Sequence, residues 1–213
     1  MGRGGVITKI EVQKRSPDRR SIFIDNAFAF GLAEEIVVKN KLRVGLDLTD
    51  DHIERLLLNE EEKKAREYVF NLLSYRDRSC REVRDRLQDK GYDADIIDRV
   101  VQALKRSHLL DDERFALEWG RNRLMKNPMG ARLLSQELWK KGIPQGIIDR
   151  AIEHLYDEMD EVRLATSAIE NRRARYKELE SHKAYKRLSD FLARRGFSWD
   201  VVREVLQEFE HEN

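Results

Sequence analysis

Arginine and lysine are the residues of this chain whose types and spacing point most clearly to a chemical role. Arg121 to Lys141 carries six basic residues against one acidic residue, and Arg163 to Arg195 carries ten against four. The guanidinium group of arginine presents a planar fork of N–H donors that suits phosphate or carboxylate groups bound in a bidentate manner. These two segments therefore favour an anionic binding partner.

Acidic segments balance the basic ones, so the formal net charge of the 213 residues is only +1. Asp47 to Glu62 has seven acidic residues against one basic residue, and Gly196 to Asn213 has five against one. A balanced total argues against a simple nucleic-acid binder, but charges segregated in blocks can still form a binding surface. A plain solvated face of a helical protein remains the alternative interpretation.

The basic residues that we predict to contact a partner or DNA fall into three groups along the chain. They are Arg76, Arg78, Arg81 and Arg84; then Arg121, Arg123, Lys126, Arg132, Lys140 and Lys141; and finally Arg172, Arg173, Arg175, Lys177, Lys183, Lys186, Arg187, Arg194 and Arg195.

Patterns typical of catalysis or metal binding are not found in the sequence. The five histidines are scattered without a paired ligand spacing, and there is neither a glycine-rich phosphate loop nor a Gly-x-Ser-x-Gly elbow. Arg78 and Arg81 flank Cys80 and would lower its pKa, but a small residue packed inside the fold is the favoured interpretation. We therefore predict a binding protein and not an enzyme, without a cofactor or a metal.

The same composition bears on the compartment. A single cysteine excludes a disulfide framework, the opening "MGRGGVITKI" lacks the apolar run of a signal peptide, and no stretch is long and apolar enough to cross a membrane. We expect a cytoplasmic protein with no membrane partner. No heptad pattern demands a dimer, so we expect a monomer.

One phrase occurs three times, as "KGYDADIIDRVV" at 90–101, "KGIPQGIIDRAI" at 141–152 and "RGFSWDVVREVL" at 195–206. Apolar residues fall at helical spacing on both sides of its glycine. A glycine that follows a basic residue is typical of a helix end, because glycine tolerates positive φ and the cation faces the negative end of the helix dipole. Each phrase therefore predicts two helices joined by a tight turn.

A further helix precedes each pair, so the repeating unit is a bundle of three helices. The predicted units are 61–110, 111–158 and 159–213. Because each unit buries little surface alone, we expect a mainly α protein in which three tandem bundles stack in an elongated, curved arrangement. In "LLDDERFALEW", at the start of the second unit, we interpret Asp112 as the N-cap of the helix and not as a metal ligand.

Residues 1–60 follow a different pattern. "GVITKIEVQKR" and "RSIFIDN" alternate apolar and polar residues and are separated by "SPD", which predicts a β-hairpin with its turn there. "LAEEIVVKNKL" predicts a short helix that ends near Gly45, and Thr49 with the two following aspartates predicts the start of a long helix. This segment is a small α+β extension.

Four stretches in this order resemble the RecX regulatory family of bacteria over about residues 65–209. They are "LLSYRDRSCREVRDRLQDKGY", "LLDDERFALEWGRNR", "MGARLLSQELWKKGI" and "LSDFLARRGF". The amino-terminal segment with "FAFGL" is similar to the extension of longer family members.

The resemblance implies a modulator of the RecA recombinase. Members of the family are tandem three-helix repeats that lie in the helical groove of the RecA filament on single-stranded DNA and inhibit ATP hydrolysis and strand exchange. Some also contact DNA, which makes single-stranded DNA a further partner, with double-stranded DNA as a second candidate. A stand-alone DNA-binding module of helix-turn-helix-like repeats remains the alternative.

The resemblance also assigns motif residues, most of which we interpret as structural: the glycines form turns, and Phe115 and Trp119 pack in a core. We expect Arg76, Arg78 and Arg123 to serve a partner, because an exposed arginine gains nothing from the fold. The matching positions are Arg76, Arg78, Ser79, Asp111, Asp112, Phe115, Trp119, Arg123, Gly130, Leu138, Gly142, Leu192, Arg195 and Gly196.

Overall fold

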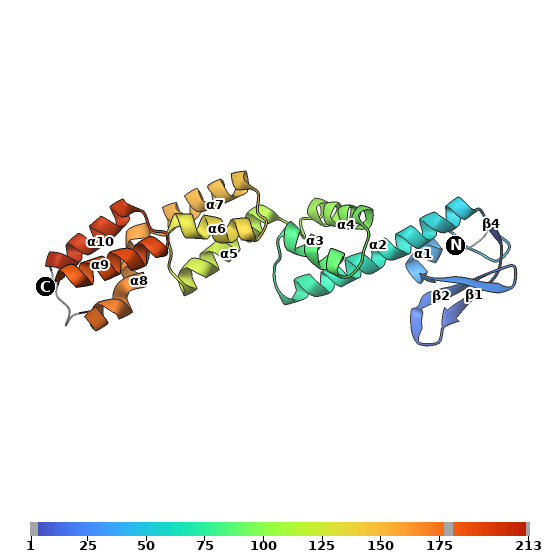
Figure 1. The fold of residues 1–213 in the computed structure, drawn as a ribbon. Helices are drawn as coiled ribbons and strands as arrows, with labels where there is room; N and C mark the ends of the chain where they lie inside the picture. The colour runs from blue at the N-terminus through green and yellow to red at the C-terminus, as the bar shows by residue number, and fades with distance from the viewer. Residues whose placement is uncertain (1–3, 177–180, 212–213) are drawn as a thin grey trace. The chain divides into compact units, whose positions relative to one another are not determined.

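The protein is a mainly helical chain with a small amino-terminal sheet (Figure 1). The computed structural model describes residues 4–176 and 181–211. The chain divides into two compact units: the first holds residues 1–76 and 86–103, and the second holds residues 77–85 and 104–213. Each unit is described by itself below.

The first unit begins with a four-stranded antiparallel sheet in the order β3-β2-β1-β4. Its strands are β1 (Gly5–Gln13), β2 (Ser16–Ile24), β3 (Ala27–Ala33) and β4 (Asp47–Leu48). Alternate residues of these strands, such as Ile7, Ile22 and Leu32, are fully buried in one apolar cluster. The period of two in the sequence therefore reflects a sheet with one covered face.

Three details of this segment differ from the prediction. The hairpin turn lies at Lys14 and Arg15, and "SPD" belongs to β2 because Ser16 pairs with Gln13. The strand β3 was not predicted, although Phe30 and Leu32 alternate in its sequence and are buried. Helix α1 (Glu34–Lys39) is shorter than predicted, because Lys41 takes a φ of 51° that ends it well before Gly45.

Helix α2 (Asp50–Tyr75) links the sheet to the first repeat as one continuous helix. The prediction of Thr49 at its start is confirmed, because the Thr49 hydroxyl accepts a hydrogen bond from the backbone N–H of His52. The buried Glu60 carboxylate accepts from the backbone N–H of Ala33 at 2.7 Å and pairs with Arg19. The predicted boundary at residue 60 therefore falls inside a helix that is anchored to the sheet.

The predicted three-helix organisation is confirmed. Repeat 1 consists of α2, α3 (Cys80–Asp89) and α4 (Ala94–Arg106). Repeat 2 consists of α5 (Asp112–Lys126), α6 (Ala131–Lys140) and α7 (Gln145–Glu158). Repeat 3 consists of α8 (Glu161–Tyr176), α9 (Ser181–Arg194) and α10 (Trp199–His211).

Repeats 2 and 3 each have an apolar core built from the positions aligned in the sequence. Leu134, Leu138 and Ile148 are buried in repeat 2 with Phe115, and Trp119 packs against them. The equivalent residues of repeat 3 include Leu188, Leu192 and Val202. At about 25 cal/mol per Å² of buried apolar surface, these residues supply the main stabilisation of each bundle.

The glycine of the repeated phrase ends the middle helix of each repeat. Gly91, Gly142 and Gly196 have φ values of 91°, 78° and 84°, a region that residues with a β-carbon rarely adopt. Pro144 is the N-cap of α7, and the Ser198 hydroxyl accepts from the backbone N–H of Val201 at the start of α10. The predicted helix–turn–helix pairs are therefore confirmed.

The prediction that Asp112 caps α5 is wrong. Asp111 is the N-cap, and its carboxylate accepts from the backbone N–H groups of Glu113 and Arg114 at 2.9 and 3.0 Å. Asp112 instead accepts a hydrogen bond from the backbone N–H of Cys80, the first residue of α3, at 2.8 Å. The two adjacent aspartates thus satisfy the starts of two different helices.

Cys80 is buried, as the favoured interpretation predicted. Burial and, to a smaller extent, the neighbouring Asp112 carboxylate raise the pKa of its thiol to about 12. A thiol with so high a pKa is a poor nucleophile at neutral pH.

Candidate partner-binding surface on repeats 2 and 3

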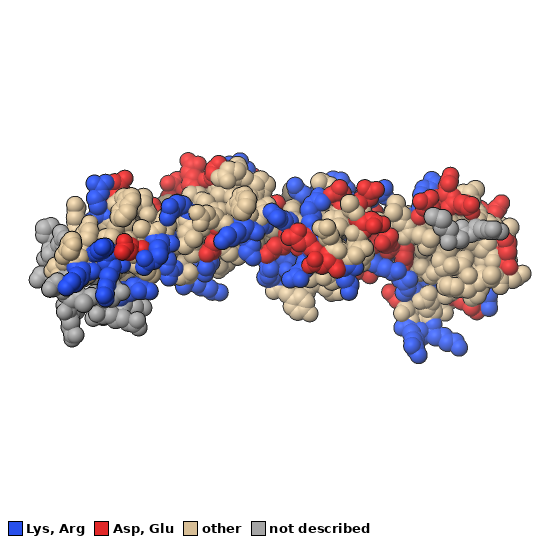
Figure 2. Space-filling model, in the orientation of Figure 1, with Lys and Arg blue, Asp and Glu red and all other residues tan. Residues whose placement is uncertain are grey.

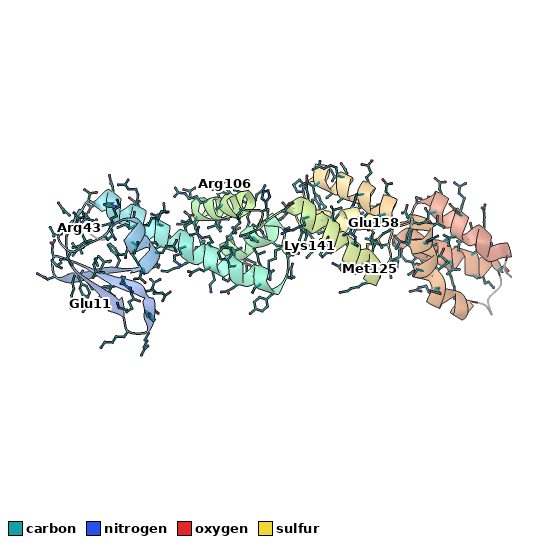
Figure 3. All side chains as sticks on the ribbon, turned by 180° about the vertical axis from the view of Figure 1, so that it is seen from behind. Glu11, Arg43, Arg106, Met125, Lys141 and Glu158 are labelled. Carbon is teal, nitrogen blue, oxygen red and sulfur yellow. The ribbon has the colours of Figure 1, made fainter. Side chains whose placement is uncertain are left out.

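Two equivalent contacts fix the helices of the second unit to one another. In the first joint, which we define by Ser79, Arg81, Lys141 and Gly142, the Ser79 hydroxyl donates to the carbonyl oxygen of Lys141 at 2.6 Å. The ammonium group of Lys141, a residue labelled in Figure 3, also pairs with Glu82 at 2.8 Å. The turn after α6 therefore lies on the start of α3.

The second joint, defined by Gly130, Arg132, Arg195 and Gly196, has the same construction. The backbone N–H of Gly130 donates to the carbonyl oxygen of Arg195 at 3.0 Å. Ser79 and Gly130 occupy the same position before the middle helix, and Lys141 and Arg195 occupy the same position before the glycine. In both joints, the residue before a middle helix thus donates to the turn of the next repeat.

The glycines of the joints are required by close approach as well as by φ. A β-carbon on Gly196 would lie 2.6 Å from the backbone nitrogen of Leu133, and one on Gly142 would lie 2.4 Å from the β-carbon of Arg81. Gly130 has an ordinary φ of −83°, yet a β-carbon there would lie 2.3 Å from the carbonyl oxygen of Gly196. Gly130 is therefore a glycine because of the joint alone.

Four residues predicted to bind a partner lie in these joints. Arg132 donates to the carbonyl oxygen of Ala193 at 3.2 Å, and Arg195 donates to Asn127 and to the carbonyl oxygen of Pro128. The Arg81 side chain packs over Gly142, and Lys141 pairs with Glu82. The joints give these cations a structural role that charge patterning alone did not predict.

Two further predicted residues form ion pairs inside repeat 2. Arg123 binds Glu137 of α6 through two hydrogen bonds of 2.7 and 2.8 Å, which lower the pKa of the Glu137 carboxyl group. Arg121 contacts Glu158 of α7 at 2.8 Å. The premise that Arg123 gains nothing from the fold is therefore wrong, because the pair ties α5 to α6.

Phe191 gathers two arginines beside the second joint. The guanidinium carbon of Arg172 lies 4.0 Å from the centre of the Phe191 ring, and that of Arg195 lies 5.3 Å from it. Burial lowers the pKa of Arg195, and the nearby positive charges of Arg123 and Arg172 lower it further. These positive charges repel one another, so a phosphate or carboxylate placed here would be stabilised.

The middle helices α6 and α9, together with the end of α5, carry exposed cations. Lys140 is the last residue of α6, Lys186 and Arg194 lie on α9, and Lys126 is the last residue of α5; all four are exposed. Among the residues that the structure describes, none of the four pairs with a carboxylate. Figure 2 shows Lys and Arg side chains over α6 and α9, whereas acidic side chains gather over α7.

The predicted residues of repeat 1 have a different setting. Helix α3 holds three basic and three acidic residues, so its charge is balanced. Arg76 is exposed, Arg78 and Arg84 are half-buried, and all three interact with neighbouring groups. A partner-binding role for these arginines remains a prediction.

The remaining predicted residues are in repeat 3. Lys183 and Arg187 are exposed on α9, and each interacts with a neighbouring group. Lys177 lies outside the described residues, and so do the side chains of Arg173 and Arg175 on α8. The prediction for these three residues is unchanged by the structure.

Two structural findings bear on other site classes. In residues 4–176 and 181–211, no group of three or more histidine, cysteine, aspartate or glutamate side chains is placed to hold a metal ion. No helix in the described part of the chain has a stretch apolar and long enough to cross a bilayer.

Comparison with known proteins identifies the family to which this arrangement of a sheet and three bundles belongs. Residues 5–49 match the model of the regulatory protein RecX N-terminal domain, and residues 65–104, 111–152 and 159–206 match the first, second and third RecX three-helix domains. This chain belongs to the RecX family. The four matches follow the order of the sheet and the three repeats.

Relatives named regulatory protein RecX align over nearly the whole chain. That of Clostridioides difficile is 31% identical over 204 residues, which cover 96% of this chain and 95% of the relative. That of Bacillus subtilis is 33% identical over 207 residues, which cover 97% and 78% of the two proteins.

Solved structures of RecX share the fold. A crystal structure of regulatory protein RecX superposes with a TM-score of 0.81 at 25% identity, covering 95% of this chain and 98% of the other. RecX from Lactobacillus salivarius superposes with a TM-score of 0.66 at 25% identity and covers 71% of this chain and 98% of its own.

Proposed function

We propose that this chain is a regulator that binds the filament of the RecA recombinase on single-stranded DNA and inhibits ATP hydrolysis and strand exchange. The proposal is supported by membership of a family of regulatory proteins and by the cationic surface of α6 and α9. The helical groove of such a filament is a repeating anionic partner, and repeated basic helices match it.

The observation that carries the proposal is the unpaired charge of the second unit. Lys126, Lys140, Lys186 and Arg194 form no ion pair with any residue that the structure describes, while acidic residues gather on α7. A fold that needed these cations for stability would pair them internally, as it pairs Arg123 with Glu137. The surface is therefore suited to a partner that brings the negative charge.

The mechanism that we propose is restraint of the filament. The second joint holds the start of α6 against the turn after α9, so the two cationic helices engage neighbouring parts of the filament together. Contacts that are weak one by one become strong when they are linked in this way. A protein bridging adjacent RecA protomers would favour one relative arrangement and oppose the motions that accompany ATP turnover.

The deciding experiment is RecA-dependent ATP hydrolysis on single-stranded DNA, measured with increasing amounts of this protein, beside its binding to the DNA alone. We expect saturable inhibition. Unchanged hydrolysis at full occupancy would refute the proposal, and tight salt-sensitive DNA binding without any effect on RecA would identify a stand-alone DNA-binding module instead.

A charge variant localises the effect. Reversal of Arg172 together with Arg173 and Arg175 should weaken filament binding and inhibition without loss of helical content by circular dichroism. Full inhibition by this variant would show that repeat 3 does not supply the contact.

A further inference from the structure

Two tryptophans of the second unit are equally exposed, and their surroundings differ. The exposed fraction of Trp139 on α6 is 63%, and that of Trp199 on α10 is 64%. The third, Trp119, packs in the core of repeat 2 with the Lys141 ammonium 5.8 Å from its ring. A single exposed apolar residue needs no explanation by itself, so the charge around each indole decides its meaning.

Trp139 stands on a cationic helix face. Arg132 and Gln136 are exposed on α6, seven and three residues before Trp139, and this spacing places them on the same side of the helix as the indole. Lys140, the next residue after Trp139, is also exposed. Arg132 also contacts Ala193 at the end of α9. The indole therefore adjoins the cationic surface of α6 and α9.

Trp199 stands on an acidic helix. Helix α10 has four acidic residues and one basic residue, and that basic residue, Arg203, pairs with Asp200 next to Trp199. An anionic ligand is attracted to the first indole and repelled from the second. The two residues form a matched pair within one unit.

We infer that Trp139 stacks on a base of single-stranded DNA whose adjacent phosphates contact Arg132 and Lys140. A single strand offers negative charge and flat aromatic rings together, which is what a cationic face with an exposed indole can bind at once. A duplex hides its base faces, and a protein surface combines negative charge with a flat ring only where an aromatic side chain lies beside carboxylates. The inference rests on the proposed function, in that the strand is the one held by the filament.

The test uses the full chain and a fluorescein-labelled oligothymidylate without RecA. We expect Trp139→Ala to weaken binding by about tenfold, since removal of one stacked aromatic costs on the order of 1–3 kcal/mol. Trp199→Ala is the matched control and should change the affinity less than about twofold. Equal effects of the two substitutions, or no binding by the unaltered chain, would overturn the inference.

Tryptophan fluorescence gives a second readout. In Trp199→Phe, saturation with the oligothymidylate should quench the emission of Trp139, whereas in Trp139→Phe the remaining emission should be unchanged. A duplex of the same length should quench far less. Quenching that persists in Trp139→Phe would assign the strand to another site.

The inference and the proposed function can fail separately. If Trp139→Ala binds the oligothymidylate normally and still inhibits RecA, the stacking inference is refuted and the proposed regulatory function is retained. If DNA stacks on Trp139 but the protein has no effect on RecA-dependent ATP hydrolysis, the proposed regulatory function is refuted and the DNA-binding site is retained. Quenching by RecA protein alone, and not by DNA, would show that Trp139 contacts a protein partner.

Discussion

Repeat 1 and repeats 2 and 3 use the same sequence phrase in different ways. A β-carbon on Gly91 would meet no atom within 4 Å, whereas one on Gly142 or Gly196 would overlap the start of another middle helix. Thus Gly91 serves only the backbone conformation, and the other two also serve contact between elements. In all three repeats the phrase ends the middle helix with a glycine. In repeats 2 and 3 this glycine also lies against the start of another middle helix.

The middle helices of the repeats also differ in charge, and the difference again separates repeat 1 from repeats 2 and 3. Helix α3 has equal numbers of basic and acidic residues, whereas α9 has four basic residues against one acidic residue. The middle helix that is followed by an open turn is thus neutral, and the middle helices whose following turns lie in the joints have a net positive charge. We propose on this basis that partner binding is concentrated in repeats 2 and 3, and each prediction below tests one part of the difference between the repeats.

The largest effect is expected for Gly196→Ala. A β-carbon there must adopt a φ of 84° and would lie 2.6 Å from a backbone nitrogen that cannot move aside. The left-handed conformation costs about 1–2 kcal/mol, and overpacking costs about 1–3 kcal/mol more. We expect the free energy of unfolding, from urea titration followed by circular dichroism, to fall by about 4 kcal/mol; a loss below about 1 kcal/mol would contradict the second joint.

A smaller loss is expected for Gly142→Ala. The overlapping atoms belong to the Arg81 side chain, which can partly move away. We expect unfolding free energy to fall by about 2–3 kcal/mol in the same titration. The double variant Gly142→Ala with Arg81→Ala should recover part of the loss, and no recovery would show that the overlap with Arg81 is not its cause.

Gly91→Ala should have the smallest effect of the three glycine substitutions. Only the φ of 91° is unfavourable for alanine, because the space around the site is open. We expect a loss of about 1 kcal/mol. A loss as large as that of Gly196→Ala would mean that the first turn is also held in a close contact, and the comparison between the repeats would fail.

The Arg123–Glu137 pair adds a weak pH dependence that repeat 1 lacks, since Leu72 and Arg86 occupy the equivalent positions. Because Arg123 lowers the pKa of Glu137 below its ordinary 4.5, the pair stabilises the fold above that pH and its contribution is lost as the pH falls through the lowered value. Arg123→Met should cost at most about 1 kcal/mol at pH 7 and nothing at pH 2. A deficit that is equal at both values would mean that packing and not charge explains the loss.

Much of the fold could be predicted from periodicity and turn chemistry. The apolar stripes around Leu134 and Leu188 and the glycines after them specify helix pairs, because both signals are local. The β3 strand (Ala27–Ala33) was missed, and its last two residues, Leu32 and Ala33, were included in the helix predicted for "LAEEIVVKNKL". Ser16 to Asp18 were taken as a turn because proline and aspartate are common in turns, whereas pairing with β1 draws them into β2.

The candidate site was less predictable, because its structure depends on contacts distant in sequence. Lys141 and Arg195 have the sequence of exposed cations, and only the fold shows that their backbone carbonyl oxygens accept hydrogen bonds from Ser79 and Gly130. Gly130 was interpreted as part of a turn, although its φ does not require glycine. Glycine at the position directly before a helix, where the backbone does not require positive φ, is the signal that could have indicated a close contact.

The central claim is that the cationic surface of repeats 2 and 3 acts on the RecA filament. It is tested most directly by RecA-dependent ATP hydrolysis on single-stranded DNA with two charge-matched variants. Lys186→Glu with Arg194→Glu alters α9, and Arg86→Glu with Arg99→Glu alters exposed cations of repeat 1. We predict that the α9 variant needs about tenfold more protein for half-inhibition, while the repeat 1 variant stays within about twofold of the unaltered chain. Equal inhibition by both variants, or a greater loss in the repeat 1 variant, would contradict the claim.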